Sequence, residues 1–276
     1  MTTATMTAGG SVRRNPGFFA QLNAEWTKLR SVRSFYIEMV LAIGLSIGMT
    51  ALIALAIGSS YDQFSEQERE TFDPVFTSFF GTIFGLITLI VLGVTFSASE
   101  YTSGMIRLTM AATPQRGRVL AAKGVLVLVV TLAAGLVMSF GCFFAGQAVL
   151  AAYDVPTASL SDNEALRAVI ATWLMTPLWP LLGTAVGFIL RSTASAITST
   201  MVLLFAPAIF GGLLPDWWQK NFIAYLPSNA GDSLMVTNRD PDMLTYLEPA
   251  LAVVVLLAWF AVFFGTAYVL LRRRDV

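Results

Sequence analysis

The chain has 276 residues, of which 56% are hydrophobic and 12% are charged, with a mean hydropathy of +0.70 and a formal net charge of zero. A soluble domain would carry about 25% charged residues, so an ordinary water-soluble fold is excluded. With one cysteine, Cys142, and no histidine, an intrachain disulfide is excluded, and metal-centred or serine-histidine catalysis is disfavoured. We therefore expect no catalytic residues, metal ion or cofactor.

The first 16 residues are rich in threonine, alanine and glycine. They lack the apolar core of a signal peptide and are expected to be disordered, while residues 17–276 are expected to form a single domain. Between Gly17 and Arg33, apolar residues recur with helical periodicity. They are Phe18, Leu22, Trp26, Leu29 and Val32. This pattern predicts an amphipathic helix in the membrane interface, either as an anchor or as a docking element for a cytosolic partner.

Six apolar stretches follow, and each is long enough to cross a hydrocarbon core of about 30 Å as a helix. They are residues 35–58, 75–97, 119–152, 165–190, 194–213 and 249–271. An acid, Glu38, interrupts the first stretch and could pair with Arg33, reach the membrane interface or line an inner vestibule. The third stretch exceeds one crossing, so tilt, a kink or cytosolic protrusion is expected. Pro177, Pro180 and Pro207 favour kinks in the fourth and fifth stretches.

Charged residues are sorted by sign among the seven polar segments that these stretches leave. The odd-numbered segments and their edges hold 13 of the 17 basic residues, namely Arg13, Arg14, Lys28, Arg30, Arg33, Arg107, Arg116, Arg118, Lys123, Arg191, Arg272, Arg273 and Arg274. The even-numbered segments hold 13 of the 17 acidic residues. Because Lys and Arg favour short cytosolic loops, both termini are expected in the cytosol. The sequence predicts an all-α, multi-pass protein of the plasma or inner membrane.

The cytosolic segment from Glu100 to Lys123 is long for a connection between two antiparallel helices. Its apolar residues alternate with charged ones, which predicts a short amphipathic helix, a break from Ala111 to Pro114, and a basic entry into the third span. Glu100 is expected at a helix start, where the dipole favours a carboxylate, and could pair with Arg107 or with a cytosolic partner. A solvated cap without a functional role is the alternative.

The last external segment, Leu214–Glu248, holds more apolar residues than a freely solvated loop would. Short helices within Asn221–Met235 that dip into the outer leaflet would explain this composition. An ordinary aromatic belt at the membrane surface would explain it equally well.

Three sequence patterns are distinctive. They are Glu25-Trp26-Thr27-Lys28-Leu29-Arg30-Ser31, then Glu100-Tyr101-x-x-Gly104-x-x-Arg107 followed by Pro114-x-Arg116 and Lys123, and finally Tyr225-Leu226-Pro227-Ser228-Asn229-Ala230-Gly231. Together they resemble permease subunits of bacterial ATP-binding-cassette exporters of the ABC type-2 class, especially actinobacterial members. The resemblance extends from about Phe18 to the C-terminus.

The resemblance implies a half-transporter with an interface helix, six membrane helices, a cytoplasmic coupling helix and an external re-entrant segment. Glu25, Trp26, Lys28 and Arg30 would belong to the interface helix, and Glu100, Tyr101, Gly104, Arg107, Pro114, Arg116 and Lys123 would form the coupling region facing the ATPase. Two permease chains, identical or related, would assemble in the lipid bilayer with two separate ATPase subunits, and no nucleic acid is implied. The chain lacks a G-x-x-x-x-G-K-[ST] loop, so it is expected to form the export pathway without itself being an enzyme.

Other classes of membrane protein are alternatives. A secondary transporter is expected to show internal repeats and charges near the membrane midplane. An intramembrane enzyme needs a catalytic dyad or a metal site within its spans. A membrane immunity or structural protein needs neither, and the sequence does not indicate which substrate a transporter would carry.

The charge pattern makes a topology prediction that needs no family knowledge. In a Cys142→Ser background, cysteine placed at Asp62 should react with an impermeant thiol reagent on intact cells, whereas cysteine placed at Gln115 should react only after the membrane is opened. Labelling of position 115 from outside would contradict the six-span topology.

Overall fold

The computed structural model describes residues 17–112, 115–235 and 244–274, and all regular secondary structure within these ranges is helical. The N-terminal segment expected to be disordered, residues 1–16, lies outside the described residues, as does Pro114 of the predicted coupling region.

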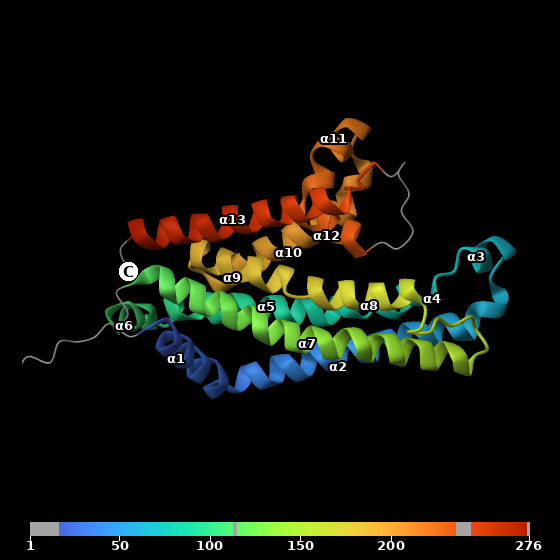
Figure 1. Cartoon of the computed structure of the whole chain (residues 1–276), viewed down its shortest axis with the longest axis horizontal. Coiled ribbons are helices and arrows are strands. Elements are labelled where there is room, and N and C mark those ends of the chain that lie inside the picture. The colour runs from blue at the N-terminus through green and yellow to red at the C-terminus, as the bar shows by residue number, and fades with distance from the viewer. Residues whose placement is uncertain (1–16, 113–114, 236–243, 275–276) are drawn as a thin grey trace, which may run out of the picture.

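The described residues contain six helical segments long and apolar enough to cross a membrane. They are α2 (Arg33–Ser60), α4 (Pro74–Phe79) with α5 (Thr82–Thr102), α7 (Arg116–Ala152), α8 (Asn163–Met175) with α9 (Leu178–Leu190), α10 (Thr193–Phe210), and α13 (Pro249–Arg273). The six predicted apolar stretches are therefore confirmed as six candidate membrane spans. The helices run side by side along the long axis of the molecule (Figure 1).

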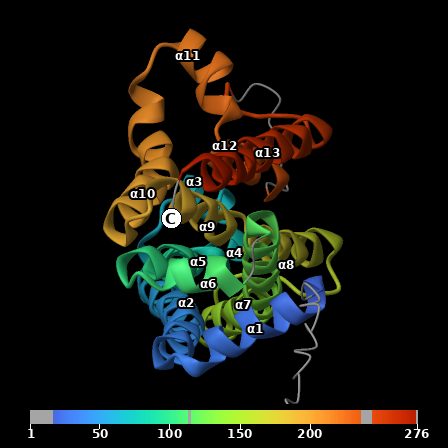
Figure 2. The same ribbon diagram turned by 90° about the vertical axis from the view of Figure 1, so that its left-hand side faces the viewer.

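The shorter elements lie toward the two ends of this bundle. At one end, here called the α6 end, lie α1 (Phe18–Ser31), α6 (Met105–Ala112) and the last turn of α13 (Figures 1 and 2). The opposite, α3 end carries η1 (Tyr61–Gln63) and α3 (Glu66–Glu70). The remaining elements, η2 (Gly211–Leu213), α11 (Asp216–Asn221), η3 (Ile223–Tyr225) and α12 (Pro227–Met235), connect α10 to α13. The basic segments between the spans thus gather at the α6 end.

Two of the six spans are broken within the bundle. One break, at Phe80 and Gly81, separates α4 from α5, and the other, at Thr176 and Pro177, separates α8 from α9. Pro177 favours its break because proline lacks a backbone donor, as the sequence predicts. Pro180 lies in the first turn of α9, where proline is tolerated, so the two prolines together produce one break.

Close approaches at glycine hold the central helices together. The helix α5 packs extensively against α2 and α9. A side chain at Gly85 would collide with Ser46 and the backbone of α2, and Gly187 lies equally close to Ser97 of α5. By contrast, nothing lies within 4 Å of the Cβ position of Gly44. Gly85 and Gly187 therefore mark close contacts between helices, while Gly44 on α2 faces away from the rest of the chain.

The helix α7 runs unbroken for 37 residues, which corresponds to about 56 Å. Near the α3 end, the Gln147 side chain donates hydrogen bonds to the Pro74 carbonyl at 2.9 Å and to the Ser78 hydroxyl at 3.0 Å. Near its middle, Gly135 packs directly against Thr176, at the break between α8 and α9. The excess length of the third span is thus accommodated without a break in the helix.

The glycine contacts predict unequal effects of the same substitution at two positions. Gly85→Val should lower the stability of the purified protein by about 1–3 kcal/mol, because the methyl groups collide with α2. Gly44→Val, the matched control, should change stability by less than about 0.5 kcal/mol. Denaturant unfolding in detergent measures both, and an equal loss in the two variants would contradict the packing.

Candidate functional site

A closed ring of four charged side chains joins α1, α5 and α7 near the α6 end. Lys28 Nζ lies 2.8 Å from Glu25 Oε1 and 3.2 Å from Glu100 Oε1. Lys123 Nζ lies 2.9 Å from Glu25 Oε2 and 2.9 Å from Glu100 Oε1. Each carboxylate therefore pairs with both ammonium groups, and the formal charge of the ring is zero. These four residues are called the charge ring below.

The charge ring is largely shielded from solvent. Glu25 and Lys123 are 0% exposed and Glu100 is 8% exposed, whereas the Lys28 side chain keeps 35% of its surface accessible. Burial of an ion costs several kcal/mol, and this cost is offset only when the partners and hydrogen bonds are all in place. The ring therefore constrains the relative positions of three helices.

Further contacts satisfy the remaining donors of the two lysines. Lys123 Nζ donates to the Phe96 carbonyl at 2.8 Å and lies 3.9 Å from the centroid of the Phe96 ring. Lys28 Nζ donates to the Thr109 hydroxyl on α6 at 3.0 Å. Because an ammonium group has three donors, Lys28 uses all of them on Glu25, Glu100 and Thr109. The contact with Thr109 connects α6 to the ring.

The pKa of Lys28 reflects this balance. Burial alone would lower the pKa of its ammonium group, but hydrogen bonding to Glu25 and the negative charges of Glu100 and Glu25 outweigh that effect and raise it. Lys28 consequently stays charged over the whole physiological pH range.

The buried face of α1 differs from the predicted apolar stripe. The residues that α1 buries are Gln21, Glu25 and Leu29, at four-residue spacing, and α1 packs against α7. The Gln21 amide donates to Glu25 Oε1 at 3.0 Å. Trp26, expected at the centre of the stripe, is 38% exposed and makes an edge-to-face contact with Phe35. The polar face packs inward because it supplies a partner for buried Lys123.

The predicted environment of Glu100 is wrong. Glu100 lies in the last turn of α5, where the helix dipole disfavours a carboxylate. Its partners are Lys28 and Lys123, while Arg107 is exposed on α6. Glu100 is also not a solvated cap, because only 8% of its surface is exposed.

The short helix α6 matches the predicted amphipathic helix. Gly104 connects α5 to α6 with φ of +71°, a conformation that favours glycine. The helix buries Ile106, Thr109 and Met110 and exposes Leu108 at its outer face. The helix α6 therefore packs one face against the bundle and leaves the opposite face exposed.

Two further predicted residues make contacts apart from the charge ring. The Arg191 guanidinium lies 5.2 Å from the Tyr101 ring centroid, in a cation–π contact. Arg116 Nη1 donates to the Leu271 carbonyl at 2.6 Å and to the Arg274 carbonyl at 3.0 Å, and so satisfies acceptors at the C-terminus of α13. Arg30, also predicted, is exposed.

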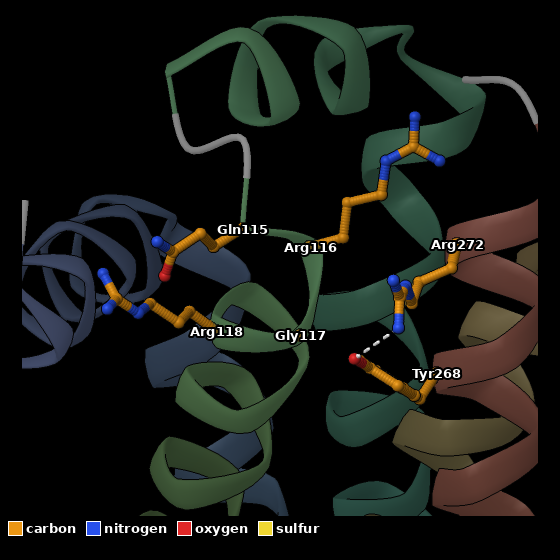
Figure 3. A pocket seen from close by; sticks show the side chains of 6 residues that line it. All are labelled: Gln115, Arg116, Gly117, Arg118, Tyr268 and Arg272. Carbon is orange, nitrogen blue, oxygen red and sulfur yellow. Dashed lines mark hydrogen bonds between the residues drawn. The ribbon is translucent and has the colours of Figure 1, made fainter. Parts of the chain in front are cut away.

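A polar pocket of about 580 Å³ surrounds the first turn of α7. It is lined by Gln115, Arg116, Gly117, Arg118, Tyr268 and Arg272. Figure 3 shows Gln115 and Arg118 on one side of this turn, while Arg272 and Tyr268 lie on the other and are joined by a hydrogen bond of 3.2 Å. The α6 end therefore presents arginines around the start of α7.

A second cavity of about 670 Å³ borders the charge ring between α1, α2 and α5. Lys28 and Glu100 line it, together with Glu38 of α2. Within the described residues Glu38 forms no ion pair with Arg33, which was one of the three arrangements open from the sequence. Glu38 thus lines a cavity at the α6 end.

The structure brings four of the predicted residues, Glu25, Lys28, Glu100 and Lys123, into one site. The ring contacts with Gln21, Phe96 and Thr109 are absent from the sequence-based prediction. Of these contacts, only the one between Gln21 and Glu25 could have been predicted from the local sequence, because residues at i and i+4 are neighbours on a helix. Comparison with known proteins finds no matching family model and no matching curated protein.

The charge ring predicts a large stability cost when one member is removed. Lys123→Met leaves two buried carboxylates with a single cation and should cost about 3–5 kcal/mol. Arg107→Met, on the exposed face of α6, should cost less than about 0.5 kcal/mol.

Combining Glu100→Gln with Lys123→Met should recover part of the loss, because the ring regains charge balance. Denaturant midpoints of the unaltered chain, Glu100→Gln, Lys123→Met and the double variant measure the coupling free energy. Additive losses would show that the two side chains do not interact.

Proposed function

We propose that this chain is the transmembrane subunit of an ATP-binding-cassette exporter and that separate ATPase subunits drive it. Two copies, or one copy and a related chain, would form the pathway through the lipid bilayer. The proposal is supported by six candidate spans, by the resemblance of three sequence patterns to type-2 exporter permeases, and above all by the charge ring beside α6.

The charge ring supports a coupling role because it connects a surface helix to the interior. Thr109 of α6 accepts a hydrogen bond from Lys28, and Lys28 pairs with Glu100 at the end of α5. Lys123 extends the connection into α7. A displacement of α6 would therefore change a set of buried charge contacts, which tolerate few geometries. Such a response is what an ATPase that moves a coupling helix requires.

The outer face of α6 offers a surface on which an ATPase could dock. Leu108 is 69% exposed and Met105 is 48% exposed, and Arg107 is exposed between them. Exposed apolar side chains flanking a charge are typical of an interaction surface on a short helix. In this arrangement one face of α6 would contact the ATPase while Thr109, on the other, contacts Lys28.

The docking face gives the test of this function. Leu108→Asp should abolish co-purification with the ATPase expected to be encoded beside this chain, because it places a charge at the centre of the contact. Leu108→Met, the matched control, should retain it. Glu100 is unsuitable for this test, since its replacement also breaks the charge ring.

The readouts are ATPase bound per permease and ATP hydrolysed per minute, on protein that elutes as a single species after insertion. Binding and hydrolysis that are unchanged in Leu108→Asp would remove α6 from the interface. Absence of any ATPase that binds the unaltered chain would contradict the exporter function.

A further inference from the structure

A cavity of about 280 Å³ lies apart from the charge ring, between α5, α8, α9, α10 and α12. Its walls are formed by the first turn of α5, the break between α8 and α9, the second half of α10 and one face of α12. Most of the lining is apolar, including Leu86, Met175, Trp179, Leu204 and Phe205. Such a mostly apolar cavity with few polar groups is the usual form of a small-molecule site.

One charged side chain, Asp232 of α12, lies among the described residues that line this cavity. Its carboxylate makes no hydrogen bond or ion pair within the part of the chain that the structure describes. The Asp232 side chain is exposed, and the protein packed around it raises the pKa of the carboxyl to about 6. Four residues earlier on α12, the Ser228 hydroxyl lines the same cavity and is buried without a hydrogen-bond partner in the described structure.

Two of the three threonine hydroxyls in the lining, those of Thr82 and Thr176, favour a positively charged ligand. The Thr82 hydroxyl donates to the Phe79 carbonyl at 2.6 Å, and the Thr176 hydroxyl donates to the Thr172 carbonyl at 2.8 Å. Because their protons are engaged, these hydroxyls can offer only lone pairs to a ligand. The described lining includes no lysine or arginine that could hold an anion.

The aromatic lining adds a preference for a cation with apolar substituents. The Trp179 and Phe205 side chains both line the cavity, and aromatic faces attract cations, more strongly where water is excluded. The volume of about 280 Å³ lies just below the range of about 300–1,000 Å³ for ligand pockets. It suits a small cationic amphiphile or the charged end of a longer one.

We propose that this cavity binds an amphiphile carrying one positive charge and that the Asp232 carboxylate is its counter-ion. A carboxylate that lines a mostly apolar cavity and has no protein partner is stabilised by a ligand that carries the opposite charge. As the substrate class of the exporter, this inference rests on the proposed function, whereas binding itself requires no ATPase.

The pH dependence of binding should arise from protonation of the Asp232 carboxyl alone. Of the elements packed against α12, α8 carries Glu164 and Arg167, and η3 carries Tyr225. The helix α13 follows Glu248 and carries Tyr268, Arg272 and Arg273 near its other end. None of these groups lines the cavity, and the pKa of Asp232 is raised by desolvation alone. The helix α10 has no charged residue. Protonation of Asp232 should therefore weaken cation binding as the pH falls through about 6.

The experiment measures binding of radiolabelled tetraphenylphosphonium to the purified full chain in nanodiscs, without an ATPase. At about pH 8, where the carboxyl is ionised, saturable binding is expected. Tetraphenylborate, which has the same shape and the opposite charge, is assayed separately, and it should show no saturable binding beyond its partitioning into empty nanodiscs. Asp232→Asn should weaken binding about tenfold or more, Asp232→Glu should retain it, and Asp216→Asn, at an exposed carboxylate of α11, should leave it unchanged.

A pH titration of the unaltered chain tests the same carboxylate without a substitution. Affinity should fall between about pH 8 and about pH 5 in the unaltered chain and stay constant in Asp232→Asn. Equal affinity for the two ions, undiminished binding in Asp232→Asn, or a flat pH profile would overturn the proposal. Each of these outcomes is independent of ATPase co-purification, so the site and the exporter function can fail separately.

Discussion

The charge ring is the constraint on which the arrangement of the α6 end depends. A helix of 14 residues such as α1 is marginally stable alone in water, so tertiary contacts must fix it. Glu25 supplies that contact, because its removal would leave Lys123 buried with one fewer counter-charge. The same requirement aligns the end of α5 with the start of α7. Charge balance among three helices thus determines a geometry that apolar packing alone would leave less specific.

The membrane spans were predictable from sequence, whereas the partners of the buried charges were not. Each span must satisfy its own backbone hydrogen bonds in lipid, so hydropathy and length locate it without knowledge of the fold. Glu100 shows the limit, because local spacing suggested Arg107, but its partners lie 72 and 23 residues away in the chain. The burial of the polar face of α1 was not predictable for the same reason, because its partner Lys123 belongs to another helix.

The charge ring and the Asp232 cavity share the helix α5. Glu100 lies in its last turn and Thr82 is its first residue, which separates the two sites by about 27 Å along the helix. Gly93 and Gly85 bring α5 against α9 and α2 without intervening side chains. A helix packed this closely moves as a unit, so the two sites are connected by a rigid element.

The unbroken helix α7 is held by contacts at three points along its length. Lys123 holds it near one end and Gln147 holds it near the other, about 36 Å apart along the axis. Between these two points, Gly135 contacts Thr176 so closely that a methyl group on the glycine would collide with the threonine side chain. A tilt of α7 about this contact would move the two ends of the helix in opposite directions. Opening at one end of the molecule would then accompany narrowing at the other, as the proposed export function would require.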